Sequence, residues 1–308
     1  MAIDSATQSF LAAAAAAGRK PLHESTPAEA REASAGSEAM YGSGPEMASS
    51  EDITLTAADG GSFVVRVLRP RTRPKAVLTY YHGGGWVLAD IVGFDALGRT
   101  IAAAADVAVV LVNYRKAPEN PFPAAVEDAW TALRWVDQNV EAIAGERVPL
   151  LVGGDSAGGN LAIVTALRAR EAGGPAIELA LLVYPVTDSD TGRPSYVDPA
   201  NQLMLSKPAM EWFFEHYVGD GDRAHPEISP LRVPDLSGFP ASVVALAEHD
   251  PLLDEGAAFA ERLREVGALR DVRVFDGQMH GFFTMVNVLP GSAAAIDYLV
   301  AHVRDHLD

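Results

Sequence analysis

Residues 148–161 have the sequence VPLLVGGDSAGGNL, and this stretch decides the fold. It begins with the apolar run 148–152, which is typical of a strand buried on both faces. It ends in helical sequence that continues over 157–172. Between the two lies a tight turn of small residues around Ser156. The order of strand, turn and helix predicts one unit of a parallel α/β structure with a serine at the turn.

The serine at this turn has the surroundings of a nucleophile. A serine hydroxyl is weakly nucleophilic, so it needs a base within reach and backbone N–H groups facing the developing oxyanion. Gly154 and Gly158 complete the pattern G-x-S-x-G, which between a strand and a helix is the nucleophile elbow of the α/β-hydrolases. The alternative is a helix N-terminus capped by Asp155 or Ser156. We interpret Ser156 as the nucleophile and Asp155 as a solvated or locally bonded turn residue, because a neighbour cannot easily reach behind the base.

The rest of the chain alternates between strand and helix. Apolar runs that suit a central parallel sheet lie at 76–81, 107–113, 148–152, 181–184, 242–246 and 272–275. Helical patterns lie at 94–105, 124–140, 157–172, 255–266 and 292–307. Two further strands, 53–56 and 63–68, flank the turn at 59–61 and predict a hairpin. This order predicts an α/β fold with a mostly parallel central sheet flanked by helices.

Two segments lie outside that alternation. Residues 1–50 are Ala-rich and polar, with helical patterns at 5–17 and 27–40 and a capping box at Thr26 and Glu29. Residues 188–234 contain many Pro, Gly and Asp and one aromatic helix at 210–218. We therefore predict N-terminal cap helices over 1–50 and a catalytic domain over 51–308, with a cap insertion at about 188–234.

A glycine-rich loop, HGGGW at 82–86, directly follows the first predicted sheet strand. Glycines free the backbone, so several N–H groups can converge on one oxygen. We predict that the N–H groups of Gly84, Gly85 and Ala157 form an oxyanion hole. The alternatives are a flexible turn or a phosphate nest, although the dinucleotide pattern G-x-G-x-x-G is absent. We expect His82 to brace this loop by a hydrogen bond rather than to transfer a proton.

Position along the chain selects the base among eight histidines. His280 follows the last predicted strand and precedes the C-terminal helix, where this class of hydrolase carries its histidine. His302 and His306 have the i,i+4 spacing of a metal pair, but no third ligand and no H-E-x-x-H is evident, so a solvated helix face is preferred. We interpret the others as polar surface or N-terminal residues: His216, His225, His249 and His23.

The acid that orients the base should follow a strand downstream of the serine. Asp250 stands at the end of the run 242–246, and Pro251 keeps it out of helical geometry. Asp254 and Glu255 fall in the first turn of the next helix, where acidic residues complement the helix dipole. We choose Asp250, with Asp254 second and Glu248 third.

Composition excludes several classes of protein. The formal net charge of −17 disfavours nucleic acid and anionic membrane surfaces as partners. The chain has no cysteine, so disulfides and thiolate chemistry are excluded. Residues 10–17 resemble a signal-peptide core, but no basic residue precedes them, and no apolar run is long enough to predict membrane insertion. We expect a cytoplasmic protein.

These motifs together resemble the hormone-sensitive-lipase-like family of bacterial carboxylesterases, within the α/β-hydrolases, in the branch whose elbow is GDSAG. The loop at 82–86 resembles the family's HGGGW, and YRKAPE at 114–119 resembles its YRLAPE turn. The residues FPAA at 122–125, with Asp128, are similar to the stretch that follows. Ser156, Asp250 and His280 each match a triad position, and the match covers nearly the whole chain.

Three residues depart from the family pattern. Lys116 replaces a leucine, Leu253 stands where a basic residue is common, and Ala89 stands where a glycine is often found. The resemblance implies a helical cap, activity on short- to medium-chain acyl esters without a metal or organic cofactor, and a possible homodimer through the sheet edge.

The expected mechanism is an acyl-enzyme on Ser156, with His280 as base and Asp250 stabilising the imidazolium. Substrate-binding aromatics are expected among Trp86, Tyr184, Trp212, Phe213 and Phe282, although each could equally be core. The same triad could instead cleave an amide, carbonate or lactone or transfer the acyl group. A non-catalytic ligand-binding receptor would require a damaged triad, and all three members are present.

Overall fold

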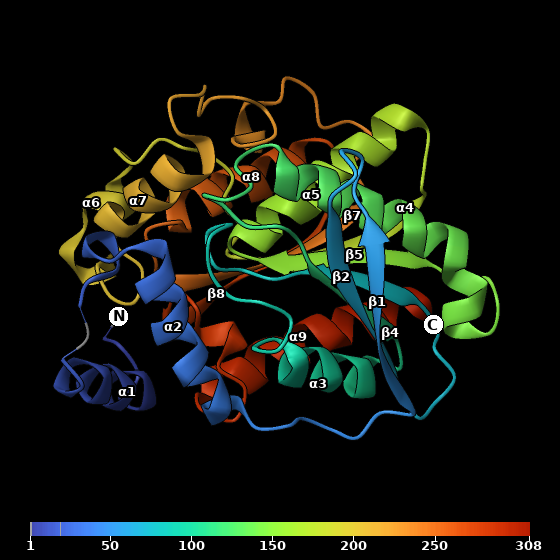
Figure 1. The fold of residues 1–308 in the computed structure, drawn as a ribbon, viewed down its shortest axis with the longest axis horizontal. Coiled ribbons are helices and arrows are strands. Elements are labelled where there is room, and N and C mark those ends of the chain that lie inside the picture. The colour runs from blue at the N-terminus through green and yellow to red at the C-terminus, as the bar shows by residue number, and fades with distance from the viewer. Residues whose placement is uncertain (1, 19) are drawn as a thin grey trace.

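The computed structural model describes residues 2–18 and 20–308 and is organised around one eight-stranded sheet (Figure 1). The spatial order of its strands is β1-β2-β4-β3-β5-β6-β7-β8. Their bounds are β1 Ser49–Thr56, β2 Ser62–Arg69, β3 Val77–Tyr81, β4 Ala108–Asn113, β5 Leu150–Asp155, β6 Ile177–Val183, β7 Ala241–His249 and β8 Leu269–Met279. β1 and β2 form the predicted hairpin, and β2 pairs antiparallel with β4. All later pairings are parallel, which confirms the predicted sheet.

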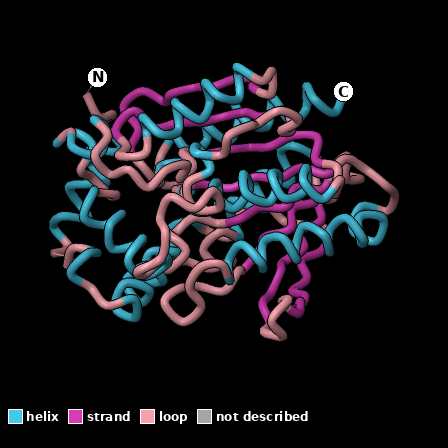
Figure 2. The backbone as a smooth tube through the Cα atoms, turned by 90° about the horizontal axis from the view of Figure 1, so that it is seen from above, coloured by secondary structure: helices cyan, strands magenta, loops and turns pink. Residues whose placement is uncertain are grey.

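Helices cover both faces of this sheet. Their bounds are α1 Ser5–Ala16, α2 Pro27–Glu38, α3 Asp95–Ala105, α4 Ala124–Ala144, α5 Ala157–Ala172, α6 Pro194–Val197, α7 Lys207–Val218, α8 Leu253–Glu265 and α9 Pro290–Leu307. Figure 1 shows α4, α5 and α8 on one side of the sheet and α3 and α9 on the other. Viewed from above in Figure 2, the strands run side by side and most long loops lie toward one end of them.

The two faces carry separate hydrophobic cores. Val109 and Val110 are neighbours in β4 but belong to different cores, because successive side chains of a strand point to opposite faces. Val110 belongs to the core that includes residues of α4, α5 and α8, whereas Val109 belongs to the core that includes residues of α3 and α9. β3, β4 and β5 are buried along almost their whole length, which explains their uninterrupted apolar sequences.

The chain between α1 and α2 lies against α7 of the 188–234 segment, at one end of the sheet (Figure 1). The indole Nε1 of Trp212, in α7, donates to the Ser25 carbonyl at 3.1 Å. The predicted capping box is present, since Thr26 N donates to Glu29 Oε2 at 2.8 Å and Glu29 N to Thr26 Oγ1 at 3.3 Å. The two segments that lie outside the alternation of strands and helices, residues 1–50 and 188–234, are therefore in direct contact.

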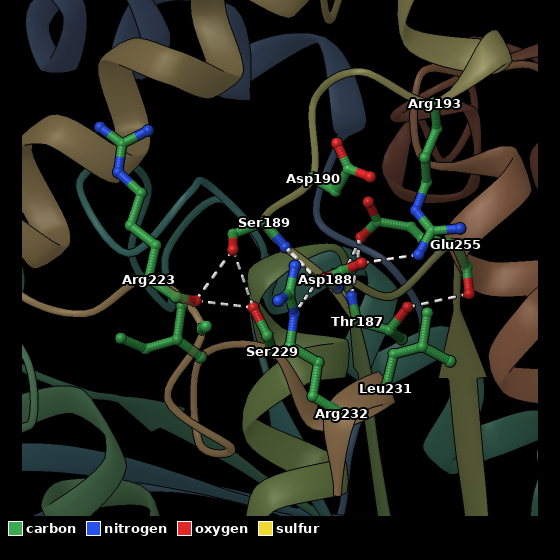
Figure 3. A network of polar contacts seen from close by, with 12 residues as sticks. Thr187, Asp188, Ser189, Asp190, Arg193, Arg223, Ser229, Leu231, Arg232 and Glu255 are labelled. Carbon is green, nitrogen blue, oxygen red and sulfur yellow. Dashed lines mark hydrogen bonds and ion pairs between the residues drawn. The ribbon is translucent and has the colours of Figure 1, made fainter.

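A buried carboxyl group, that of Glu255, fastens the start of the 188–234 segment to helix α8 (Figure 3). Its Oε1 accepts from the backbone N–H groups of Thr187 at 2.7 Å and Asp188 at 3.2 Å. Its Oε2 accepts from the Tyr196 hydroxyl at 3.1 Å. Glu255 lies in the first turn of α8, as the sequence predicts, and its side chain is in addition fully buried.

Asp188 holds the same segment by charge (Figure 3). Its carboxylate accepts from Arg193 at 2.6 Å and from Arg232 at 2.7 Å. The hydroxyl groups of Ser189 and Ser229 lie 3.0 Å apart and both donate to the Arg223 carbonyl. The start and the end of the segment are thus joined to each other as well as to α8.

The folding stability of the wild type should fall as pH rises because Glu255 ionises, and the variant Glu255→Gln should not show this fall. Burial raises the pKa of Glu255 to about 8 from an ordinary value of 4.5. Its contribution to folding is therefore complete below about pH 4.5 and is lost as the pH rises to about 8. Glutamine keeps the shape and does not titrate. Between pH 4.5 and about 8, the Tm of the wild type should fall relative to the Tm of Glu255→Gln. A difference in Tm that does not change with pH would contradict the expectation.

Candidate active site

Ser156 lies between β5 and α5 in a strained backbone conformation, with φ 56° and ψ −122°. Its N–H donates to the Val183 carbonyl at 2.9 Å, and its carbonyl accepts from Val186 N at 3.1 Å. A Cβ at Gly158 would overlap the Tyr81 carbonyl oxygen, so only glycine fits where the turn passes β3. Such strain persists where the surroundings determine the backbone, and it is concentrated at functional sites.

The structure brings Ser156, His280 and Asp250 together from three separate loops. His280 follows β8, and its Nε2 lies 3.0 Å from Ser156 Oγ. Its Nδ1 lies 2.7 Å from Asp250 Oδ2, in the loop after β7. The Asp250 side chain is fully buried, and its Oδ1 accepts from Leu252 N at 2.8 Å. With Nδ1 donating to the carboxylate, Nε2 is left as the acceptor for the serine proton.

The competing carboxylates have other partners. Asp254 Oδ2 accepts from Ser195 N at 2.8 Å, and Glu248 Oε2 accepts from Gly277 N at 2.7 Å. Within residues 2–18 and 20–308, the carboxylate bonded to His280 is that of Asp250. The geometry therefore agrees with the order of preference taken from the sequence.

Asp155 is buried and bonded, so the solvated alternative is wrong for this residue. Its Oδ1 accepts from the Tyr80 hydroxyl at 2.8 Å and from Gly83 N at 3.1 Å. Burial raises the pKa of Asp155 to about 6. The carboxyl group thereby joins the elbow to the start of the glycine-rich loop. Sequence reasoning missed Tyr80 because nothing in a strand residue 75 positions away marks it as the partner.

The glycine-rich loop presents free backbone donors. Gly84 has φ 106° and Gly85 has φ 59°, and the Gly84 carbonyl accepts from Val87 N at 3.1 Å and Leu88 N at 2.8 Å. In the described part of the chain, the N–H groups of Gly84, Gly85 and Ala157 donate to no protein acceptor. These are the three donors predicted for the oxyanion hole, and they are available to a substrate oxygen.

His82 braces the loop in the way the sequence predicts. Its Nδ1 lies 2.7 Å from the Gly83 carbonyl, and its ring stacks on Tyr114 at a centroid distance of 4.3 Å. The Tyr114 hydroxyl donates to the His82 carbonyl at 2.8 Å. Burial lowers the pKa of His82 to about 3, so the ring is neutral near pH 7.

The five candidate pocket aromatics are all buried, and they divide into two groups. The Tyr184 ring lies 4.5 Å from the His280 ring and 5.9 Å from Phe282. Phe213 lies directly over Gly85, where a Cβ would overlap its ring. By contrast, Trp86 stacks at 4.2 Å on Tyr217, and Trp212 is bonded to the N-terminal segment. Tyr184 and Phe213 are thus beside the catalytic groups, whereas Trp86 has the surroundings of a core residue.

None of the remaining histidines contacts Ser156 or Asp250 in the described residues, although His249 directly precedes Asp250 in the chain. The sequence predicts a surface position for His249, but this residue ends β7 and is only 7% exposed. His302 faces Asp271 at 3.2 Å and His306 faces Glu178 at 3.3 Å. Among the residues that the structure describes, no group of three His, Cys, Asp or Glu side chains could hold a metal ion.

Two of the three departures from the family pattern have a structural account. Ala89 has φ 64°, a conformation in which glycine is more comfortable. The Lys116 ammonium donates to Asn113 Oδ1 at 2.8 Å, and burial lowers the pKa of Lys116 to about 8. Leu253 is the first residue of α8 and packs partly buried against the core, and the structure does not explain its replacement of a basic residue.

Comparison with known proteins agrees with this fold and site. The family model described as α/β hydrolase fold matches residues 78–284, and the chain belongs to that family. It is 39% identical over 223 residues to the carboxylesterase NlhH of Mycobacterium tuberculosis, covering 71% of this chain and 70% of the relative. It is 34% identical over 296 residues to the ethyl acetate hydrolase of Pseudomonas putida, covering 93% and 92%.

Solved structures show the same likeness over the whole chain. The ester hydrolase EH1AB1 from the Lake Arreo metagenome, complexed with a bipyridine phosphonate derivative, superposes with a TM-score of 0.92 at 35% identity, covering 99% of both chains. These matches confirm the resemblance to the bacterial carboxylesterases and the predicted class of enzyme, a carboxylic ester hydrolase. No described helix is long and apolar enough to cross a membrane.

Proposed function

We propose that this protein hydrolyses short- to medium-chain carboxylic esters through an acyl-enzyme on Ser156. The observation that carries the proposal is the line of contacts from Ser156 Oγ to His280 Nε2 at 3.0 Å and from His280 Nδ1 to Asp250 at 2.7 Å. It is the arrangement in which an imidazole can take the serine proton while a carboxylate stabilises the charge that forms.

In the first half of the reaction, Ser156 Oγ attacks the ester carbonyl carbon and its proton passes to His280 Nε2. The carbonyl oxygen becomes an oxyanion that accepts from Gly84, Gly85 and Ala157, whose N–H groups have no other partner in the described chain. Collapse of the intermediate expels the alcohol, which takes the proton from His280. In the second half, water gives a proton to His280 and its oxygen attacks the acyl carbon. Collapse of this second intermediate breaks the bond to Ser156 Oγ, which takes the proton back from His280 as the acid leaves.

The acyl preference rests on the family resemblance, on a relative named for ethyl acetate, and on the aromatic side chains beside the triad. The Phe213 ring lies over Gly85, and the buried Tyr184 ring lies beside His280. We expect Phe213, Tyr184 and Phe282 to line the acyl pocket, and Trp212 to support Phe213 through an edge contact at 5.2 Å.

The test is hydrolysis of p-nitrophenyl esters of increasing acyl length, with fluorophosphonate labelling in parallel. Turnover should be fastest for short and medium chains, and one fluorophosphonate should add at Ser156 and abolish it. A rate that rises steadily to the longest chains would refute the acyl preference. Full activity after labelling, or a label at another residue, would refute the nucleophile.

Amide, carbonate or lactone cleavage and acyl transfer use the same triad, so substrate panels with added alcohol acceptors distinguish them from ester hydrolysis. A non-catalytic receptor is disfavoured by the contacts made by Ser156 and His280. A cytoplasmic location and a homodimer belong to the same proposal, and cell fractionation and sedimentation velocity test them.

A further inference from the structure

The loop at 82–89 has an unusual backbone that contacts from outside the loop must hold. Gly84, Gly85, Trp86 and Ala89 all have positive φ, at 106°, 59°, 59° and 64°. Trp86 and Ala89 carry a Cβ, so each costs of the order of 1–3 kcal/mol in this region. A loop of this kind keeps its geometry only where several outside contacts determine it.

Several outside contacts on this loop have already been described, including those of Tyr114 with His82 and of Phe213 with Gly85. Asp155 accepts from Gly83 N at the start of the loop, and Trp86 stacks on Tyr217 in the middle. Another is the bond from Ala117 N to the Trp86 carbonyl at 2.9 Å. Ala117 belongs to the YRKAPE turn, which connects the loop to the chain following β4.

A further contact comes from the N-terminal helix α2. Arg31 Nε donates to the Val87 carbonyl at 2.8 Å, two residues after Gly85. Its Nη2 donates to the Ala117 carbonyl at 2.7 Å. The same guanidinium forms a two-pronged ion pair with Glu119, at 2.8 and 2.7 Å. Arg31 thus bridges the two turns that already touch at Trp86.

We propose that Arg31 is a positioning residue that holds the glycine-rich loop so that the N–H groups of Gly84 and Gly85 point at the substrate oxygen. This inference rests on the proposed function. It assigns the accessory N-terminal helices a part in the reaction, through a side chain that touches no reacting atom. Arginine suits the task because its planar group can donate to two carbonyls and a carboxylate at once.

Glu119 pairs with the guanidinium and does not touch the loop. The Arg31 guanidinium holds the pKa of Glu119 low, at about 2, so the pair is charged at neutral pH. The Glu119 side chain is 58% exposed and that of Arg31 is 30% exposed, so water screens their attraction. The effect on the loop therefore rests on the two contacts that Arg31 makes with carbonyl groups. Replacing Arg31 should lower kcat much more than replacing Glu119.

The experiment compares Arg31→Ala, Arg31→Lys and Glu119→Gln with a matched control, Arg262→Ala. Arg262 also donates to two backbone carbonyls, those of Leu231 and Pro234, at 2.7 and 3.2 Å. The readouts are kcat and KM for a short-chain ester and the inhibition constant of a trifluoromethyl ketone. Ser156 Oγ adds to the carbon of this ketone, its proton passes to His280, and the ketone oxygen becomes an oxyanion held as in the reaction.

Arg31→Ala should lower kcat roughly tenfold with KM changed by less than about twofold, and should weaken ketone inhibition by the same factor as kcat/KM. Arg31→Lys should recover part of the loss, because an ammonium can still donate to one carbonyl. Glu119→Gln and Arg262→Ala should retain wild-type kcat and inhibition within about twofold.

Wild-type kcat and inhibition in folded Arg31→Ala would overturn the inference. If Arg31→Ala does not fold, Arg31→Lys and Glu119→Gln decide the question. Wild-type kinetics in Arg31→Lys together with a large loss of kcat in Glu119→Gln would also overturn the inference. A wild-type enzyme that the ketone does not inhibit would instead refute Ser156 as the nucleophile, and the two failures are therefore distinguishable.

Discussion

Replacing Ser156 with alanine should lower kcat for ester hydrolysis by a factor of the order of 10⁶. The Oγ is the only heavy atom removed, and it is the atom that forms the proposed acyl-enzyme. Because Ser156 Oγ contacts His280 and the turn is held by backbone bonds, the fold should be unaffected. Circular dichroism and thermal unfolding check the fold, and activity on a chromogenic ester checks the chemistry.

Ser156→Gly provides the matched control for this prediction. It should be equally inactive, yet more stable than the alanine variant by about 1 kcal/mol, because glycine accepts φ 56° without strain while losing some stability through backbone entropy. Residual turnover above the uncatalysed rate in both variants would point to another nucleophile. Equal Tm values would show that the turn is less strained than its dihedral angles indicate.

Asp250→Asn should lower kcat by a factor of the order of 10⁴ while leaving substrate binding nearly unchanged. An amide can present its N–H to the imidazole, which then holds the wrong tautomer and cannot accept the serine proton. Asp250 Oδ2 lies 2.7 Å from His280 Nδ1, so the replacement acts on the contact that sets this tautomer. Steady-state kinetics of the folded variant test the prediction.

Asp254→Asn is the control for this change. Asp254 lies in the first turn of α8 and accepts from Ser195 N at 2.8 Å, so its replacement removes a negative charge near Asp250 in the sequence without touching His280. It should retain kcat within about threefold. A large loss in Asp254→Asn with little loss in Asp250→Asn would exchange the roles of the two carboxylates.

The triad candidates could be found in the sequence because each is marked locally. Ser156 stands in a turn where only glycine fits at the neighbouring positions, because a Cβ there would overlap other atoms. Asp250 and His280 each directly follow a strand. The strands themselves are visible as apolar runs. Their ends are not, since β5 continues to Asp155 and β8 spans Leu269–Met279, beyond the predicted 148–152 and 272–275. Buried glycines and polar residues inside a sheet leave no apolar signature.

The buried polar residues were beyond sequence reasoning for a related reason. Glu255 and Asp155 occur at positions where charged residues are usually exposed, and only their distant partners make burial possible. Glu255 is covered by residues 187–188, and Asp155 accepts from Tyr80, 75 positions earlier. Arg31 likewise meets Val87 and Ala117 only after folding. No local periodicity encodes such pairings.

The carboxyl ends of parallel strands hold the three groups of the triad, whereas the aromatic ring over Gly85 comes from α7, in the segment fastened by Asp188 and Glu255. The proposed triad and the aromatic ring expected to line the acyl pocket thus come from different parts of the polypeptide. Under the proposed function, substitutions in the 188–234 segment can change the acyl preference while Ser156, His280 and Asp250 keep their contacts. That modularity allows one scaffold to serve many substrates.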